Sequence, residues 1–153
     1  MDINESIDIF NSLIIINNDR IDGYKSAYSE TYKEELRDLF MEFQQTSLQC
    51  KTELENEVKR LGGTPEEGTM ILGKFHRGWM DIKAAITGSD SNTILDSCEF
   101  GEQTIIKAYE DALEQDKEEF SYEQKAMLNY HITLLRIDYE KVKTIEVLVE
   151  DKI

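Results

Sequence analysis

The stretch INESIDIFNSLIIINNDRIDGYKSAYS, residues 3–29, decides the fold of this chain. Apolar or aromatic side chains recur along it at alternating spacings of three and four residues, with Asn17 as the single polar exception. The stripe consists of Ile3, Ile7, Phe10, Ile14, Asn17, Ile21, Tyr24 and Tyr28. This spacing is typical of an amphipathic α-helix, so the stretch predicts a helix over residues 3–29.

The same period continues through the rest of the chain. It predicts further helices over residues 33–61, 69–87, 92–115 and 121–147. The pair Gly62-Gly63 ends the second of the five helices, because a glycine can adopt the left-handed conformation that caps a helix. The helix over 69–87 is the shortest, and we expect it to lie across the domain.

Four of the predicted helices have roughly 25 residues and are therefore about 37 Å long. Short turns join the first helix to the second and the fourth to the fifth, so each pair predicts an antiparallel hairpin. A long connection that holds the helix over 69–87 joins the two hairpins. Two hairpins with one long crossover describe the ferritin-like four-helix bundle. The sequence therefore predicts one all-α domain over residues 1–153.

The charge of the chain limits its partners. Its 153 residues include 32 acidic and 17 basic side chains, which gives a formal net charge of −15. Nucleic acids and anionic membranes attract basic surfaces, so we expect neither as a partner. The first residues lack the pattern of a signal peptide, and no apolar run is long enough to span a membrane. We expect a cytoplasmic protein with two reduced, buried thiols, Cys50 and Cys98.

Two glutamates break the apolar pattern of the helix over 92–115. Glu99 and Glu102 are three residues apart and share a helix face that is otherwise apolar. Burial of an uncompensated carboxylate costs several kcal/mol. We therefore expect something to neutralise these two side chains.

Three compensating arrangements are compatible with the sequence. One is a metal ion, since bundle cores are where carboxylate di-metal sites are built. Another is shared protonation, because two close carboxylates raise the pKa of one of them. The third is an internal cation or donor set, with the candidates His76, Arg77, Lys83, Tyr24 and Tyr109. Further polar residues near core positions are Asn17, Asp22, Gln45, Gln49, His131 and Asp138.

The spacing of the histidines disfavours a di-iron site. Such bundles use Glu-x-x-His twice, whereas Gly73 lies three residues before His76 and Leu128 lies three residues before His131. No phosphate-binding loop and no nucleophile-histidine arrangement can be recognised in the chain either.

Four stretches carry a family resemblance: EVKRLGGTPE at residues 57–66, HRGWMDIKAAITG at 76–88, CEFGE at 98–102 and KAYEDAL at 107–113. On these stretches the chain resembles the uncharacterised bacterial ferritin-like four-helix-bundle proteins grouped under a domain of unknown function. The resemblance extends over nearly the whole chain and includes Asn18-Asp19 and Gly23-Tyr24 in the first helix. It implies a ferritin-like bundle in a bacterial cytoplasm and no assigned activity.

The resemblance also implies a set of signature residues: Asp19, Tyr24, His76, Arg77, Trp79, Glu99, Glu102 and Tyr109. The chain departs from the family pattern at two positions. Ile137 stands where members have a histidine, just before the aspartate that corresponds to Asp138, and Gln49 stands where members tend to have an acid. Both departures disfavour a metal site.

Two functional hypotheses follow. The first is a non-catalytic bundle protein, a structural or stress-associated interaction module that forms a homodimer through one bundle face. The second is a carboxylate-rich site that binds iron or manganese and performs redox or metal-handling chemistry. Its candidate ligands are Glu99, Glu102, His131 and Asp138, with Asp22 or Gln49 completing the shell. We expect the first, without catalytic residues and with a protein partner that the sequence leaves open.

Overall fold

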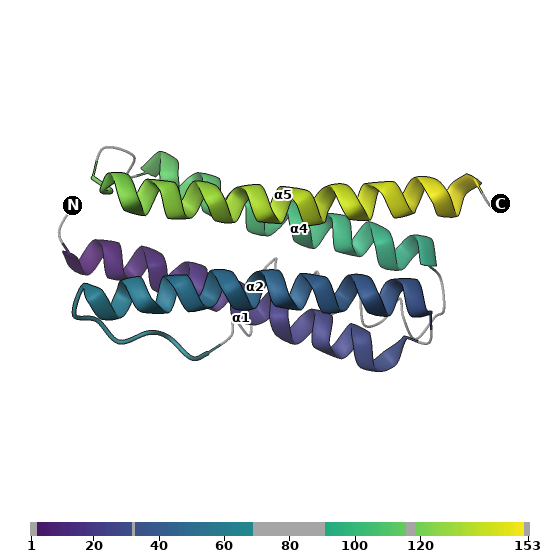
Figure 1. Ribbon diagram of the computed structural model, residues 1–153, viewed down its shortest axis with the longest axis horizontal. Coiled ribbons are helices and arrows are strands. Elements are labelled where there is room, and N and C mark those ends of the chain that lie inside the picture. The colour runs from purple at the N-terminus through teal and green to yellow at the C-terminus, as the bar shows by residue number, and fades with distance from the viewer. Residues whose placement is uncertain (1–2, 32, 69–90, 116–118, 152–153) are drawn as a thin grey trace.

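The computed structural model of the chain describes residues 3–31, 33–68, 91–115 and 119–151. In these ranges the chain forms four α-helices and no strand (Figure 1). The helices are α1 (Ile3–Glu30), α2 (Glu34–Arg60), α4 (Ser91–Gln115) and α5 (Tyr122–Asp151). The all-helical prediction is confirmed, and three of the predicted helices match to within one residue at each end. The fourth, α5, continues to Asp151 rather than ending at 147.

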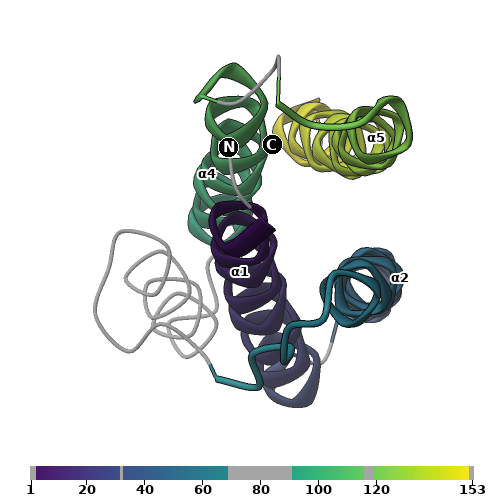
Figure 2. The ribbon, with the colours of Figure 1, turned by 90° about the vertical axis from the view of Figure 1, so that its left-hand side faces the viewer.

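The four helices run along a common long axis (Figure 1). Helices α1 and α2 are antiparallel, as are α4 and α5. Since α2 ends at one end of the bundle and α4 begins at the other, α2 and α4 run in the same direction. In the end-on view the helices occupy four corners, with α1 beside α2 and α4, and α5 beside α2 and α4 (Figure 2). The α1–α2 and α4–α5 pairs pack most extensively, so the two predicted hairpins are present.

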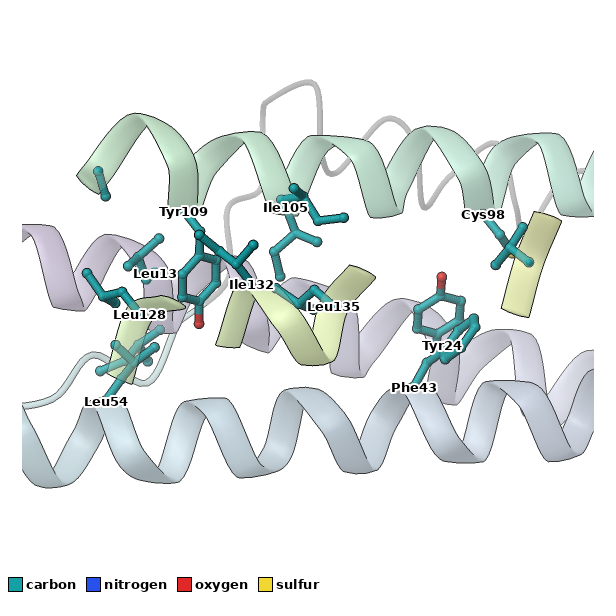
Figure 3. Close-up of a cluster of buried hydrophobic side chains, with 14 of the residues drawn as sticks. Leu13, Tyr24, Phe43, Leu54, Cys98, Ile105, Tyr109, Leu128, Ile132 and Leu135 are labelled. Atoms are coloured by element: carbon teal, nitrogen blue, oxygen red, sulfur yellow. The ribbon is translucent and has the colours of Figure 1, made fainter. Parts of the chain in front are cut away.

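The core lies along the axis that the four helices share. Each helix contributes fully buried side chains, among them Phe10 and Ile14, Phe43 and Leu54, Leu95 and Ile105, and Leu128 and Leu135. Figure 3 shows side chains from several helices pointing toward one another in this cluster. Full burial of one such side chain contributes roughly 1.5–3 kcal/mol, so the apolar core is the main source of stability.

The end of α2 has the geometry that its glycines predict. Gly62 adopts a φ of +88°, which a residue with a side chain rarely tolerates. The N–H of Gly62 donates to the carbonyl of Lys59 at 3.0 Å, and the N–H of Gly63 donates to that of Val58 at 2.9 Å. This pair of bonds is the Schellman motif, and the prediction that a glycine caps this helix is confirmed.

The segment after α2 turns back along α1. The side chain of Asn11 donates to the carbonyl of Thr64 at 3.1 Å and accepts from the N–H of Glu66 at 2.9 Å. Further along α1, Asn18 donates to the carbonyl of Gly68 at 3.0 Å. The start of the connection therefore lies against α1. The predicted crossover helix over 69–87 falls outside the described residues.

None of the helices in the described ranges combines the length and the apolar character that a membrane span requires.

Candidate functional site

A fully buried arginine, Arg20 of α1, lies at the centre of the bundle. Its Nε and Nη2 atoms donate to the carboxylate of Glu102 at 2.8–3.1 Å, and Nη2 also donates to Asp138 Oδ2 at 2.9 Å. Its Nη1 atom donates to the backbone carbonyl of Phe43 and to the hydroxyl of Ser47, each at 2.9 Å. All five N–H groups of the guanidinium thus have an acceptor.

Arg20 joins all four described helices through these contacts. The side chain starts on α1, and its acceptors belong to α2 (Phe43 and Ser47), α4 (Glu102) and α5 (Asp138). A planar guanidinium suits this role because its donors point in fixed directions within one plane. Arg20 and its acceptors on α2, α4 and α5 therefore specify how the two hairpins are aligned along the bundle axis.

Tyr24 completes the group around Glu102. Its hydroxyl donates to Glu102 Oε1 at 2.5 Å, and its ring stacks on Phe40 and meets Phe43 edge-on. The guanidinium carbon of Arg20 lies 5.3 Å from the centre of the Tyr24 ring and 5.2 Å from that of Phe43. Two aromatic rings thus flank the cation and add cation–π attraction.

Burial and charge act in opposition on the titration of this group. Burial lowers the pKa of Arg20, but the nearby acidic groups, Glu102 foremost, raise it above its ordinary value. Burial raises the pKa of Glu102, opposed by the charge of Arg20 and by hydrogen bonds from Tyr24 and Arg20. Burial and the carboxylate also raise the pKa of Tyr24 well above its ordinary value, so its hydroxyl remains a donor.

A second buried polar group surrounds His131 of α5. The amide nitrogen of Asn17 donates to the hydroxyl of Tyr109 at 3.0 Å, and that hydroxyl lies 3.0 Å from His131 Nδ1. Since the Tyr109 oxygen already accepts from Asn17, its own proton is free to donate to Nδ1. The other ring nitrogen of His131, Nε2, lies 3.6 Å from Glu53 Oε1.

Three atoms of this second group have no hydrogen-bond partner among the described residues: Asn17 Oδ1, His131 Nε2 and Glu53 Oε2. Burial lowers the pKa of His131, although the nearby carboxylate of Glu53 acts in the opposite direction. The histidine is therefore neutral near pH 7. On α4 and α5 the second group lies seven residues from the first, which corresponds to about 10 Å along the axis.

The predicted pairing of Glu99 with Glu102 on one inner face requires correction. Glu102 is fully buried, whereas Glu99 is partly exposed at the flank between α4 and α5. There it accepts hydrogen bonds from the hydroxyl of Tyr139 at 3.3 Å and from Lys143 Nζ at 3.2 Å. Glu99 and Glu102 therefore lie on different sides of α4, and only the side chain of Glu102 is buried in the core.

The other predicted site residues are distributed over separate places. Asp138 shares Arg20 with Glu102, and His131 belongs to the second polar group. Asp22 and Gln49 are exposed on the surface, and Gln45 is exposed as well, so their predicted place in the core is wrong. Asp19 is buried. His76, Arg77, Trp79 and Lys83 lie outside the described residues.

The described structure does not bring the candidate metal ligands together at one place. Within the described ranges, no three His, Cys, Asp or Glu side chains are grouped closely enough to hold a metal ion. The buried carboxylates of Glu102 and Asp138 already share the positive charge of Arg20.

Sequence reasoning missed Arg20, although the pattern contained a signal for it. The buried face of α1 follows Phe10, Leu13, Asn17, Arg20, Tyr24 and Ala27, again at alternating spacings of three and four. The predicted stripe passed through Ile21 and Tyr28 instead, which are only partly buried. An arginine on a stripe with this spacing indicates a buried partner carboxylate.

Both cysteines are free and buried, as predicted. Burial raises the pKa of Cys50 to about 12, so this thiol is protonated and unreactive near pH 7.

Comparison with known protein families identifies one match. The model of a domain of unknown function, DUF2383, matches residues 5–115. The match contains Arg20, Tyr24, Ser47 and Glu102, whereas Asp138 lies beyond its end. No curated protein matches the chain. Since the matched range spans most of the 153 residues, the chain belongs to the DUF2383 family.

Proposed function

We propose that this protein is a non-catalytic, ferritin-like bundle of the bacterial cytoplasm that serves as a structural interaction module. The observation that carries the proposal is Arg20, a protein cation with every donor satisfied, between the carboxylates of Glu102 and Asp138. Both buried carboxylates have a protein cation as their partner, so this group needs no metal to be stable. Its link to a stress response stays a prediction.

The order of the helices supports the ferritin-like affiliation. The two antiparallel hairpins have α2 and α4 in the same direction, which requires a connection that travels the length of the bundle. One long crossover between two hairpins is the arrangement of ferritin-like folds. The beginning of that connection is held on α1 by Asn11 and Asn18.

Among the described residues, the reactive groups around Arg20 are buried, which supports a non-catalytic role. Tyr24 is held protonated by burial and by Glu102, and the Cys50 thiol is protonated as well. Catalytic acids and nucleophiles are instead poised near the working pH and reachable from a cleft. Neither condition applies to the groups around Arg20, which are fully buried.

The alternative function is metal binding with redox or metal-handling chemistry. The observation that favours metal binding is that two buried atoms of the second polar group, His131 Nε2 and Glu53 Oε2, have no hydrogen-bond partner among the described residues. Imidazole and carboxylate are suitable ligands for iron or manganese, but two ligands are fewer than the sets found in bundle metal sites.

Elemental analysis tests the proposal against this alternative. Untagged protein from cultures supplied with iron and manganese is compared with the Glu102→Gln and Glu53→Gln variants. We expect no stoichiometric metal in any of the three and the same Tm with and without a chelator. Near-stoichiometric metal that either variant loses, together with a lower Tm after chelation, would overturn the proposal. The Glu99→Gln variant is the matched control, because Glu99 is paired at the flank.

A further inference from the structure

A groove with an apolar floor runs along the seam between α2 and α5. Its volume is about 660 Å³, and its floor consists of Leu39 on α2 with Ile137 and Ile145 on α5. Ile137 is 49% exposed there. The two helices of this seam pack less extensively against each other than the helices of either hairpin do, which leaves room for the groove. The described segment that follows α2 lies against α1 and does not cover this seam (Figure 2).

Acidic side chains surround this floor. The charged lining residues are four acids and two bases: Glu35, Asp38, Glu42, Glu140, Arg136 and Lys141. Glu42 is paired with Lys141 at 2.8 Å. Arg136 lies 3.8 Å from Glu110 of α4. No cation among the described residues lies within ion-pair distance of the other three acids. We call these three exposed residues, Glu35, Asp38 and Glu140, the acidic rim.

The combination of an apolar floor with unpaired acids distinguishes this groove from two neighbouring hollows. A hollow of about 610 Å³ between α4 and α5 is lined by two acidic and two basic residues. Another, of about 450 Å³, lies further along the α2–α5 seam and is lined mainly by polar residues, with Glu53 as its acid. Of the three, the groove beside Ile137 is the one that joins a mostly apolar lining to an excess of negative charge.

We infer that this groove is the docking site for a basic amphipathic helix of a partner protein. The inference rests on the proposed function as an interaction module and names the chemical class of its partner. Helices of this kind bind in grooves through apolar side chains at i, i+3 or i+4, and i+7. Such anchors span about 10.5 Å. The groove extends over positions 35–42 of α2 and 136–145 of α5, a length of about 10–14 Å that matches this spacing.

Charge complementarity indicates that the partner helix is basic. The acidic rim lies on both sides of the floor, because Glu35 and Asp38 belong to α2 and Glu140 belongs to α5. Lys or Arg side chains on the two flanks of an apolar stripe would meet these carboxylates. The net charge of −15 also attracts a basic partner at longer range. Another copy of this chain supplies no complementary charge, so the homodimer predicted from the sequence is not assigned to this groove.

Fluorescence anisotropy with a labelled peptide tests the inference on the full chain. The peptide has about 18 residues, above the length at which isolated helices are marginal, with Leu along one face and Lys on both flanks of that face. Two matched peptides serve as comparisons. One has the same composition in scrambled order, and in the other Glu replaces every Lys. We expect the Kd of the basic amphipathic peptide to be at least tenfold lower than the Kd of either comparison peptide.

Charge variants separate docking in the groove from general attraction to an acidic protein. Asp38→Lys/Glu140→Lys should raise the Kd at least tenfold. Asp8→Lys/Asp22→Lys makes the same change in net charge at exposed positions of α1, which does not line the groove, and should raise the Kd by less than about threefold. Circular dichroism verifies folding. If the groove variant loses helix content, the Asn/Gln pair Asp38→Asn/Glu140→Gln replaces it, with Asp8→Asn/Asp22→Asn as the control.

An apolar variant tests the floor of the groove. Ile137→Gln removes an exposed apolar contact without adding charge, and it should also raise the Kd of the basic amphipathic peptide. Phe100→Gln is the matched control, because Phe100 is 47% exposed on α4 and does not line the groove. The Kd of this control should equal that of the unchanged protein.

The inference would be overturned by equal binding of the ordered and the scrambled basic peptide, or by equal effects of the two charge variants. A dimer in sedimentation that Ile137→Gln dissociates and the basic peptide does not displace would assign the groove to a second copy and overturn it as well. Metal content keeps this test apart from that of the proposed function. Metal-free protein that binds no peptide would refute the groove but not the neutralised core, whereas metal-loaded protein that binds the peptide would refute the non-catalytic function but not the groove.

Discussion

Glu102 is a buried carboxylate whose ionisation depends on its neighbours. Burial raises its pKa, while Arg20 and the hydroxyl of Tyr24 stabilise the charged form. Because Asp138 also contacts Arg20, the group contains one more carboxylate than cation. The hydrogen bond from Tyr24 therefore carries part of the stabilisation that a second cation would otherwise supply.

Tyr24→Phe removes that hydrogen bond without changing the shape of the core. A hydrogen bond to a charged group contributes about 1.5–3 kcal/mol, so we expect the free energy of unfolding to fall by that amount. Urea denaturation measures the difference. Tyr122→Phe is the control, because Tyr122 is 83% exposed and its loss should have no measurable effect. Equal effects of the two substitutions would contradict the role given to Tyr24.

His131 makes stability depend on pH. Burial lowers its pKa in the folded state, so near pH 6 the unfolded chain binds the proton more readily than the folded one. The free energy of unfolding should therefore be fully retained above about pH 6.5 and should decrease as the pH falls toward the lowered pKa. The groups that face His131 are Glu53 from α2, Tyr109 from α4 and Asn17 from α1 through Tyr109.

Denaturation at a series of pH values between 7.5 and 5.5, roughly the range in which histidine titrates, measures this slope. We expect His131→Asn to flatten it, since asparagine does not titrate and its oxygen can accept from Tyr109. The chain has one other histidine, so His76→Asn is the control and should retain the slope. A slope that persists in His131→Asn and disappears in His76→Asn would be evidence against this assignment.

Sequence patterns could locate the buried carboxylate but not its cation. Glu102 was identified because an acid stands on an apolar stripe, whereas Arg20 was missed because two stripes with the same period overlap on α1. The stripe through Arg20 and Ala27 differs from the one through Ile21 and Tyr28 by one residue, and both are largely apolar. Only the position of the neighbouring helices decides which of them is buried.

At the scale of single elements, α5 begins with a reciprocal cap. The hydroxyl of Ser121 accepts from the N–H of Gln124 at 3.1 Å, and the side chain of Gln124 accepts from the N–H of Ser121 at 2.9 Å. This is a capping box, which satisfies donors that the first turn of a helix leaves free. Gln124 also donates to Glu57, which ties the start of α5 to the end of α2.

Ser121→Ala removes one half of this cap. We expect a decrease of about 1 kcal/mol in the free energy of unfolding, the usual cost of losing an N-cap side chain. Thermal and urea denaturation measure it. Thr133→Ala is the control on the same helix, since the hydroxyl of Thr133 only contacts a carbonyl within α5. A larger loss in Thr133→Ala than in Ser121→Ala would show that the cap does not stabilise the helix.

The helices themselves were predictable to within a few residues because local signals mark their ends. Gly62 and Gly63 end α2 with the bonds that left-handed geometry permits, and Ser121 begins α5. The far end of α5 carries no such signal, since neither glycine nor proline follows 147, and the helix continues to Asp151. Side-chain faces were harder to predict than ends, as the separation of Glu99 from Glu102 shows.

At the scale of the whole molecule, Arg20 links the two hairpins. The α1–α2 and α4–α5 pairs share a mainly apolar core. The guanidinium binds atoms on α2, α4 and α5 at once and so selects one register. The sequence indicated the hairpins through turn lengths, but this link depends on atoms from four helices and is visible only in three dimensions.

A double-mutant cycle between Arg20→Met and Glu102→Gln tests the central claim, that Arg20 is the cation that neutralises the core. Arg20→Met alone should cost about 3–5 kcal/mol, because it leaves two buried carboxylates without a cation. The double variant should lose less than the sum of the single losses, since Glu102→Gln removes one of those charges. We predict a coupling free energy of about 1–3 kcal/mol from urea denaturation, with a stabilising osmolyte if Arg20→Met is marginal. Losses that add to within about 0.5 kcal/mol would contradict the account.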